Sequence, residues 1–184
     1  WIRMGDYLSC SDAHEGVEIP IIAADSMLLC DYDKALVWTT LRPTDDESRL
    51  SYSMCAGLLG QMQLSGDLDL LNEVQLGFVR KFTDFYAGIS VPLRRGELTI
   101  QRMTKNRTCP KGTQVVMLET EDEALVVVHF FDTQETSISI ELPSDNWQIA
   151  DFASISQAKN CICGHTLQLS GMEQFSAAAI RLKR

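Results

Sequence analysis

The segment Ala124-Leu125-Val126-Val127-Val128 is the longest apolar run of the chain, and His129 separates it from Phe130-Phe131. Its length is that of a β-strand and falls well short of the roughly 18 apolar residues that a membrane-spanning helix needs. Residues 137–142, Ser-Ile-Ser-Ile-Glu-Leu, alternate strictly between polar and apolar side chains. Such alternation is typical of a strand with one buried face. Both stretches therefore predict a second half built from β-strands.

Further strand patterns lie on both sides of these two segments. Including them, we expect strands near residues 98–100, 114–119, 125–131, 136–142, 147–152, 166–169 and 177–182. Acidic turn segments at 121–123 and 132–135 separate neighbouring strands. About seven short strands with regular turns are typical of an antiparallel sandwich. We therefore predict a C-terminal β-sandwich domain over residues 93–184.

The first half mixes strand and helix patterns. Residues 1–8, 19–23 and 35–38 are short strand candidates, and a short apolar stretch follows at 58–64. One helix is expected after a capping box formed by Thr44 and Glu47, and a second after Asn72 with Gln75 in the box position. Strands that alternate with helices are typical of a parallel α/β fold.

The length of this half limits the α/β fold that it can form. A complete (β/α)8 barrel needs about 200 residues or more, and only about 90 precede the β-rich part. Residues 1–92 are thus either a small α/β unit or the C-terminal part of a catalytic barrel. Because the chain begins at Trp1 rather than Met, we expect a fragment of a longer protein, which favours the barrel.

Composition excludes some partners. A formal net charge of -9 argues against nucleic acid and against an anionic membrane surface. Six cysteines without disulfide-framework spacing predict free thiols, and hence a cytoplasmic location, with export left open.

The tract Cys161-Ile162-Cys163-Gly164-His165 is too tightly spaced for a structural zinc site. We expect hairpin residues there, and neither a metal nor a cofactor; a homo-oligomer stays open.

Three stretches resemble the C-terminal portion of family 36 glycoside hydrolases, the α-galactosidase group of clan D. The first, at 10–15, is Cys-Ser-Asp-Ala-His-Glu, similar to a loop after a late barrel strand. The second, at 59–68, is similar to the last barrel strand with its Ser-Gly-Asp-Leu exit turn. The third joins Phe85-Tyr86 to an arginine-glycine turn at 94–96, which in the family leads into a β-sandwich. His14-Glu15 and Gly16 depart from the family pattern, which leaves the sugar open.

The resemblance implies a retaining glycosidase that cleaves an α-linked sugar, an α-galactoside first of all. It implies Asp12 as the catalytic acid/base, with His14, Glu15 and Asp67 as substrate-binding candidates. Retaining cleavage needs a second carboxylate as nucleophile, which in the family lies on an earlier strand. We therefore expect the isolated chain to be inactive, and its partners to be a glycoside or oligosaccharide and the rest of its own barrel.

A purely structural role stays open for each of these residues. Asp12 and His14 fit a solvated loop, Asp67 fits a cap on the following turn, and Trp38 fits either a packed strand residue or a platform that stacks against a sugar. An alternative function is a non-catalytic carbohydrate- or protein-binding module built on the β-sandwich. Exposed aromatic side chains on the sandwich would favour that module.

Overall fold

The computed structural model describes residues 6–10, 16–91, 93–102, 104 and 106–184. In chain order, the elements are β1 (Leu8–Cys10), α1 (Ile19–Ser26), the 3-10 turn η1 (Tyr32–Lys34), β2 (Ala35–Leu41), α2 (Glu47–Gly57), β3 (Gln61–Gly66), η2 (Leu68–Leu70), α3 (Glu73–Ala87), η3 (Leu93–Arg95), β4 (Glu97–Arg102), β5 (Thr113–Glu119), β6 (Glu123–Phe130), β7 (Ser137–Glu141), β8 (Gln148–Ala153), β9 (Lys159–Cys163), β10 (Thr166–Ser170) and β11 (Ser176–Lys183). None of the helices in these ranges is both long and apolar enough to cross a bilayer.

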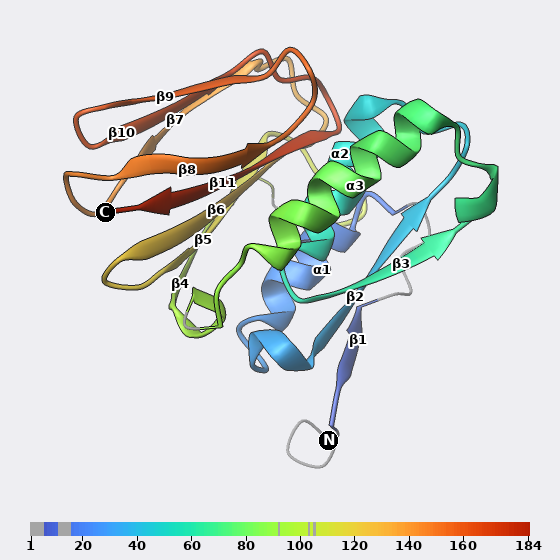
Figure 1. The fold of residues 1–184 in the computed structure, drawn as a ribbon, viewed down its shortest axis with the longest axis horizontal. Helices are drawn as coiled ribbons and strands as arrows, with labels where there is room; N and C mark the ends of the chain where they lie inside the picture. Colours follow the sequence, from blue (N-terminus) through green and yellow to red (C-terminus); the bar gives the residue numbers. More distant parts are fainter. Residues whose placement is uncertain (1–5, 11–15, 92, 103, 105) are drawn as a thin grey trace.

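The elements form four layers (Figure 1). A three-stranded antiparallel sheet, β7-β10-β9, packs on a five-stranded antiparallel sheet, β4-β5-β6-β11-β8. The helices follow, and a parallel sheet, β1-β2-β3, lies beyond them. The predicted β-rich part with antiparallel sheets is confirmed. One apolar core joins the helices to the five-stranded sheet, so the domain division at 92/93 stays a prediction.

Both faces of the five-stranded sheet are buried. In β5, Val116 and Leu118 join the core shared with the helices, whereas Val115 and Met117 join the core of the sandwich. The apolar run of β6 divides in the same way. A strand buried on both faces needs apolar side chains at every position, which explains why this segment shows no alternation.

Two predictions about the first half are wrong in detail. Residues 19–23 form helix α1 rather than a strand: Pro20 lies in its first turn, where proline is tolerated, and nearly all of its residues are buried. A helix that is apolar all round shows no helical periodicity. Helix α2 is capped by Asp46, whose carboxylate accepts from the Arg49 amide at 2.9 Å, and not by Thr44. Glu47 instead accepts from the amide of Ser156 in the sandwich.

His129 is buried where β6 meets α2. Its Nε2 lies 3.2 Å from the carbonyl oxygen of Tyr52, and the two rings pack edge to face. Burial lowers the pKa of His129 from 6.5 to about 3, although the hydrogen bond to Tyr52 acts in the opposite direction. The imidazole is therefore neutral, with Nε2 as the donor, and it binds the sheet to the helix layer.

Candidate functional site

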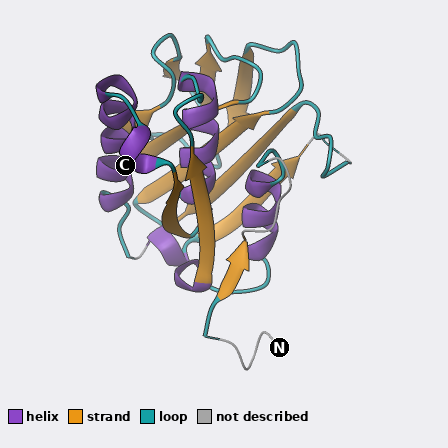
Figure 2. Cartoon of the chain, turned by 90° about the vertical axis from the view of Figure 1, so that its right-hand side faces the viewer, coloured by secondary structure: helices purple, strands orange, loops and turns teal. Residues whose placement is uncertain are grey.

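The parallel sheet has one covered and one uncovered face. In β2, Ala35, Val37, Thr39 and Leu41 are buried against the helices. The alternate residues of β2 are less buried and point to the opposite face. The side of the molecule that carries the parallel sheet faces the viewer in Figure 2. The register of the sheet places Leu36 beside Ser9 and Gln61, Trp38 beside Gln63, and Thr40 beside Ser65. Apart from Leu36 and Trp38, the uncovered face is therefore made of small or amide side chains.

Trp38 is the largest side chain on this face. It is 39% exposed, and its indole Nε1 donates to the hydroxyl of Ser9 at 3.1 Å. The neighbouring Thr39 is only 1% exposed, on the helix side. Of the two interpretations that the sequence allowed for Trp38, the fully packed residue is wrong in this structure. An open indole face with an anchored N–H is suited to stacking against an apolar face of a ligand.

The carboxyl ends of the three parallel strands share one edge of the sheet. β3 ends at Gly66 with φ +94°, where a Cβ would lie 2.1 Å from the carbonyl oxygen of Leu41. Only glycine allows this approach. It lets the amide of Asp67 donate to that same oxygen at 3.0 Å. The side chain of Asp67 makes no capping hydrogen bond to η2, and Asp67 is exposed at this edge. The predicted turn-capping role of its carboxylate is therefore wrong.

Asp12, His14 and Glu15 lie outside the described residues. In the sequence they follow the last residue of β1, Cys10, by two to five positions. Their roles stay predictions, as does substrate binding by Asp67.

The loop after β2 is held at the same edge by Gln75. As predicted, Asn72 and Gln75 form the capping box of α3, with both hydrogen bonds at 3.0 Å. The amide of Gln75 also donates to the carbonyl oxygens of Pro43 and Asp45, at 3.0 and 2.8 Å. This second role has no local sequence signal, because its partners lie some 30 residues away. A cavity of about 370 Å³ lies beside this loop and the two helix N-termini.

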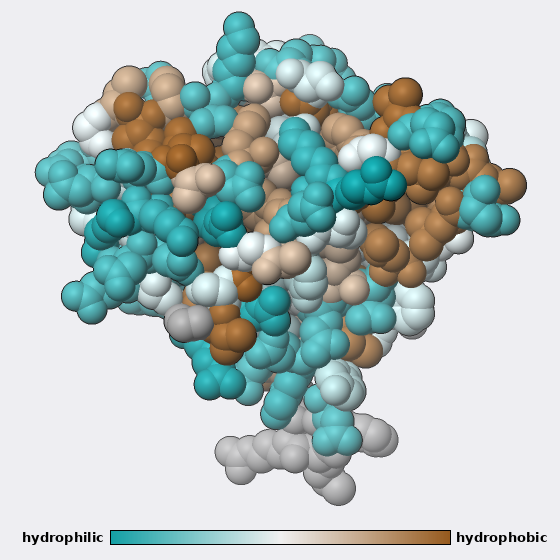
Figure 3. Space-filling view, in the orientation of Figure 1, coloured by the Kyte–Doolittle hydropathy of each residue, from teal (hydrophilic) through white to brown (hydrophobic). Residues whose placement is uncertain are grey.

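Exposed hydrophobic side chains continue beyond this edge. Leu64, Leu70 and Val74 are exposed, and Figure 3 shows hydrophobic residues gathered over β3, η2 and the start of α3. β3 itself is an edge strand, paired only with β2 among the described strands. An unpaired strand edge beside apolar side chains is typical of a surface that another polypeptide covers.

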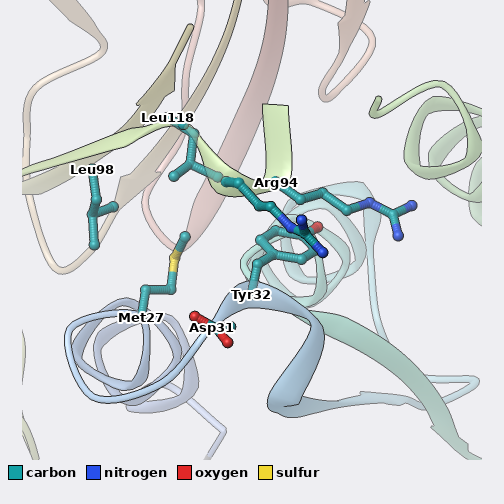
Figure 4. Close-up of a pocket in the computed structure, with 8 residues that line it drawn as sticks. Met27, Asp31, Tyr32, Arg94, Leu98 and Leu118 are labelled. Atoms are coloured by element: carbon teal, nitrogen blue, oxygen red, sulfur yellow. The ribbon is translucent and has the colours of Figure 1, made fainter. Parts of the chain in front are cut away.

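A second cavity, of about 450 Å³, lies at the opposite end of the parallel sheet (Figure 4). Its wall includes Tyr32, just before β2, and Arg94 in η3. The guanidinium of Arg94 lies over the rings of Tyr32 and Tyr86 and pairs with Asp33 at 3.4 Å. The hydroxyl of Tyr32 donates to the carbonyl oxygen of Leu58, and burial raises the pKa of Tyr32. These contacts fasten the helix layer to the sandwich and point to a structural role.

No cluster of three or more histidine, cysteine or acidic side chains suited to a metal occurs in the part of the chain that the structure describes. The five cysteines with described side chains, at 30, 55, 109, 161 and 163, are free thiols.

Comparison with known proteins bears on the fold. No family model and no curated protein matches the sequence. Among solved structures, the chain is similar to the galactosidase domain of the α-galactosidase-sucrose kinase AgaSK, with a TM-score of 0.64 and 15% identity over 95% of this chain. The GH36 α-galactosidases AgaA and AgaB of Geobacillus stearothermophilus give TM-scores of 0.62 and 0.61 at 16% identity, over 94% and 95% of this chain.

The chain covers only 25% of each of these three proteins. It has the fold of a C-terminal portion of a family 36 α-galactosidase. The resemblance seen in the sequence is thus confirmed at the level of the fold. An α-amylase of Anoxybacillus is also similar, with a TM-score of 0.51 and 13% identity over 89% of this chain and 41% of the amylase. The neighbours of this fold are therefore glycosidases.

Proposed function

We propose that residues 1–92 are the C-terminal part of a catalytic (β/α)8 barrel and that residues 93–184 are the β-sandwich that follows it. The observation that carries this proposal is the state of the parallel sheet. It is covered by helices on one face, uncovered on the other, and β1 and β3 each have only one partner strand among those described. In a closed barrel the uncovered face would line the interior, and both edges would pair with further strands.

The proposed reaction is retaining hydrolysis of an α-linked sugar, in the first place an α-galactoside. Barrel enzymes carry their catalytic groups at the carboxyl ends of the strands. Asp67 lies at such an end, directly after β3, and Asp12 follows the last residue of β1 by two positions in the sequence. Asp12 would protonate the leaving oxygen and then remove a proton from water. Asp67, His14 and Glu15 would bind sugar hydroxyls, and Trp38 would stack against the ring.

The nucleophilic carboxylate would come from a strand that is not in this sequence. It must lie about 5–5.5 Å from the acid/base across the scissile bond. The reaction needs no cofactor, because two carboxyl groups carry out both displacement steps. The active protein therefore consists of this chain and the remainder of its barrel, and the 184 residues alone should not turn over substrate.

The experiment compares the isolated chain with a product extended through the coding sequence that precedes Trp1. The substrates are a nitrophenyl α-galactoside, whose leaving group needs little protonation, and raffinose, the sugar bound in one AgaA variant structure. Only the extended product should be active. Asp12→Asn should lower its turnover of raffinose by about 10²–10⁴-fold, as expected for loss of a general acid. The loss should be clearly smaller for the nitrophenyl substrate.

Azide provides a further readout. As a nucleophile that needs no general base, it should restore turnover of the nitrophenyl substrate by Asp12→Asn. Unchanged raffinose turnover in Asp12→Asn would contradict the acid/base assignment. Turnover by the isolated chain, lost on Asp12→Asn, would show instead that these residues include their own second carboxylate.

The second candidate is a non-catalytic carbohydrate- or protein-binding module. It is favoured by the small share of the α-galactosidases that the chain spans. However, no large hydrophobic side chain of the described sandwich is exposed, and Phe130, Phe131 and Trp147 are buried. Binding of the isolated chain to immobilised glycans, combined with inactivity of the extended product, would favour this module over the enzyme.

A further inference from the structure

Two cysteines lie side by side on the outer face of the sandwich. Cys161 and Cys163 both belong to β9, which pairs only with β10 among the described strands. Both are exposed, whereas Ile162 between them packs against the sandwich core. The alternation of the strand therefore directs both thiols outward. As expected, the region is a hairpin, formed by β9 and β10. The structure adds that both thiols are exposed on the same face of β9.

The two thiols interact with each other and with the neighbouring strand. The Sγ of Cys161 donates to the Oε1 of Gln168 in β10 at 3.7 Å. Desolvation and the neighbouring thiol of Cys163 raise the pKa of Cys161. Cys161, Gln168 and Lys159 line an open surface cavity of about 580 Å³. An ion at the thiols would thus be reached directly from solvent.

Strand geometry favours a bridging ion over a disulfide. Residues i and i+2 of a strand are about 6.4–6.8 Å apart along the chain. A disulfide needs its two Cβ atoms within about 3.5–4.5 Å, which would force β9 out of its pairing with β10. Two sulfurs bound to one ion at about 2.3 Å each can be up to about 4.6 Å apart. Each Sγ then needs to lean only about 1 Å toward the other.

We propose that Cys161 and Cys163 form a two-thiolate site for a soft monovalent metal ion of the Cu(I) class. Thiolates select soft ions, and a closed-shell monovalent ion accepts two of them in a line. Zinc would need two further ligands and calcium or magnesium several oxygens, and no such cluster occurs among the described residues. His165, in the adjoining turn, is paired with Asp145 at 2.9 Å.

Binding releases two protons and transfers no electrons. Each S–H bond breaks, its proton passes to solvent, and each sulfur forms one bond to the ion. Copper must therefore be supplied as Cu(I). Because two protons compete with one ion, the apparent affinity should rise by up to about a hundredfold per pH unit below the thiol pKa values, against about tenfold for a single thiol.

The experiment titrates the protein anaerobically into a coloured Cu(I)–bathocuproine disulfonate complex and follows the loss of colour. We expect one Cu(I) per chain at this site, with Cys161→Ser and Cys163→Ser each weakening binding by at least about tenfold. Cys109, an exposed cysteine outside β9, provides the matched control, and Cys109→Ser should leave the affinity unchanged. All three positions are exposed, so circular dichroism should confirm that the variants remain folded.

Three results would overturn the proposal. One is wild-type affinity in either β9 variant, since a single thiol would then suffice. The second is a pH dependence of about tenfold per unit, which indicates release of one proton. The third is ready formation of a Cys161–Cys163 disulfide with oxidised glutathione, detected by mass spectrometry. It would show that β9 can distort enough to bring the two Cβ atoms within disulfide distance.

Discussion

The five-stranded antiparallel sheet and the three-stranded parallel sheet lie on opposite sides of the same helices. The first is buried on both faces, by the helices and by β7-β10-β9. The second is buried only on its helix face, and Trp38, Thr40 and Ser9 are exposed on the other. A sheet covered on both sides contributes stability and leaves no surface for a ligand. The open sheet, whose strand ends share one edge, is where chemistry can be placed.

Two adjacent threonines test this contrast within a single strand. Thr39 is buried on the helix face, and Thr40 is exposed on the open face. Thr39→Asp would bury an unpaired carboxylate, so we expect it to lower the free energy of unfolding by about 4 kcal/mol or more, enough to prevent folding. Thr40→Asp should change it by no more than about 0.5 kcal/mol. Chemical denaturation of both variants measures the difference.

The same pair also tests whether a barrel closes over the open face. If Thr40→Asp destabilises the isolated chain as strongly as Thr39→Asp, the face is already covered. If it is harmless there but inactivates the N-terminally extended product, the face becomes the interior of the completed barrel. If Thr40→Asp leaves both the stability of the isolated chain and the activity of the extended product unchanged, no barrel closes over this face.

The second prediction concerns the covered sheet and His129. Its pKa of about 3 in the folded protein lies below the 6.5 of an unperturbed histidine, so the unfolded state binds more protons between these values. This contribution to stability is complete above about pH 6.5 and is lost as the pH falls toward 3, by up to about 1.4 kcal/mol per pH unit. We expect a loss of about 2–3 kcal/mol between pH 6.5 and 4.5.

The control for this prediction is His129→Gln, whose amide can still donate to Tyr52 but does not titrate. Unfolding curves of the wild type and of His129→Gln across this pH range give the pH dependence of stability for each protein. The carboxylates titrate in both proteins, so the difference between the two is the contribution of His129. A pH slope that is equal in the two proteins would show that His129 is protonated in the folded state.

The third prediction concerns the loop edge of the open sheet. Gln75→Ala removes the hydrogen bond to the Asn72 amide and the two donated to Pro43 and Asp45. We expect a loss of about 2 kcal/mol, because three hydrogen bonds of one buried side chain are lost together. Gln75→Glu keeps the acceptor for Asn72 but loses both donors. A Gln75→Glu variant as stable as the wild type would show that the capping box alone matters.

Local patterns predicted the covered part of the molecule well. The alternation over 137–142 gives β7, and Asn72 with Gln75 caps α3 as expected. Local signals failed where tertiary burial decides. α1 shows no clear polar face because most of its residues are buried. Hairpin residues were expected at 161–165, and β9 and β10 form that hairpin, but the polarity of 159–163 did not mark β9 as a strand.

The candidate site could be predicted only in part. The Gly66-Asp67 turn resembles the family pattern in sequence, and in the structure it follows directly on the end of β3. The exposure of Trp38 could not be read from its own strand, because it depends on what lies over the sheet. The bridge from Gln75 to the loop after β2 could not be predicted either, since it joins segments far apart in the chain.

The smallest expected effect on stability belongs to Asp67, and it distinguishes a site residue from a structural one. Its carboxylate is exposed and does not cap η2, so Asp67→Asn should change the free energy of unfolding by less than about 0.5 kcal/mol. The backbone bond from its amide to Leu41 is retained in this variant. In the extended product, however, loss of a charged hydrogen bond to a sugar hydroxyl should raise KM for raffinose by about 10-fold or more. Gly66→Ala provides the opposite control, because it should disrupt the turn and lower stability first. A stable Asp67→Asn variant with unchanged KM would remove Asp67 from the site and leave the chemistry of this edge to the loop after β1.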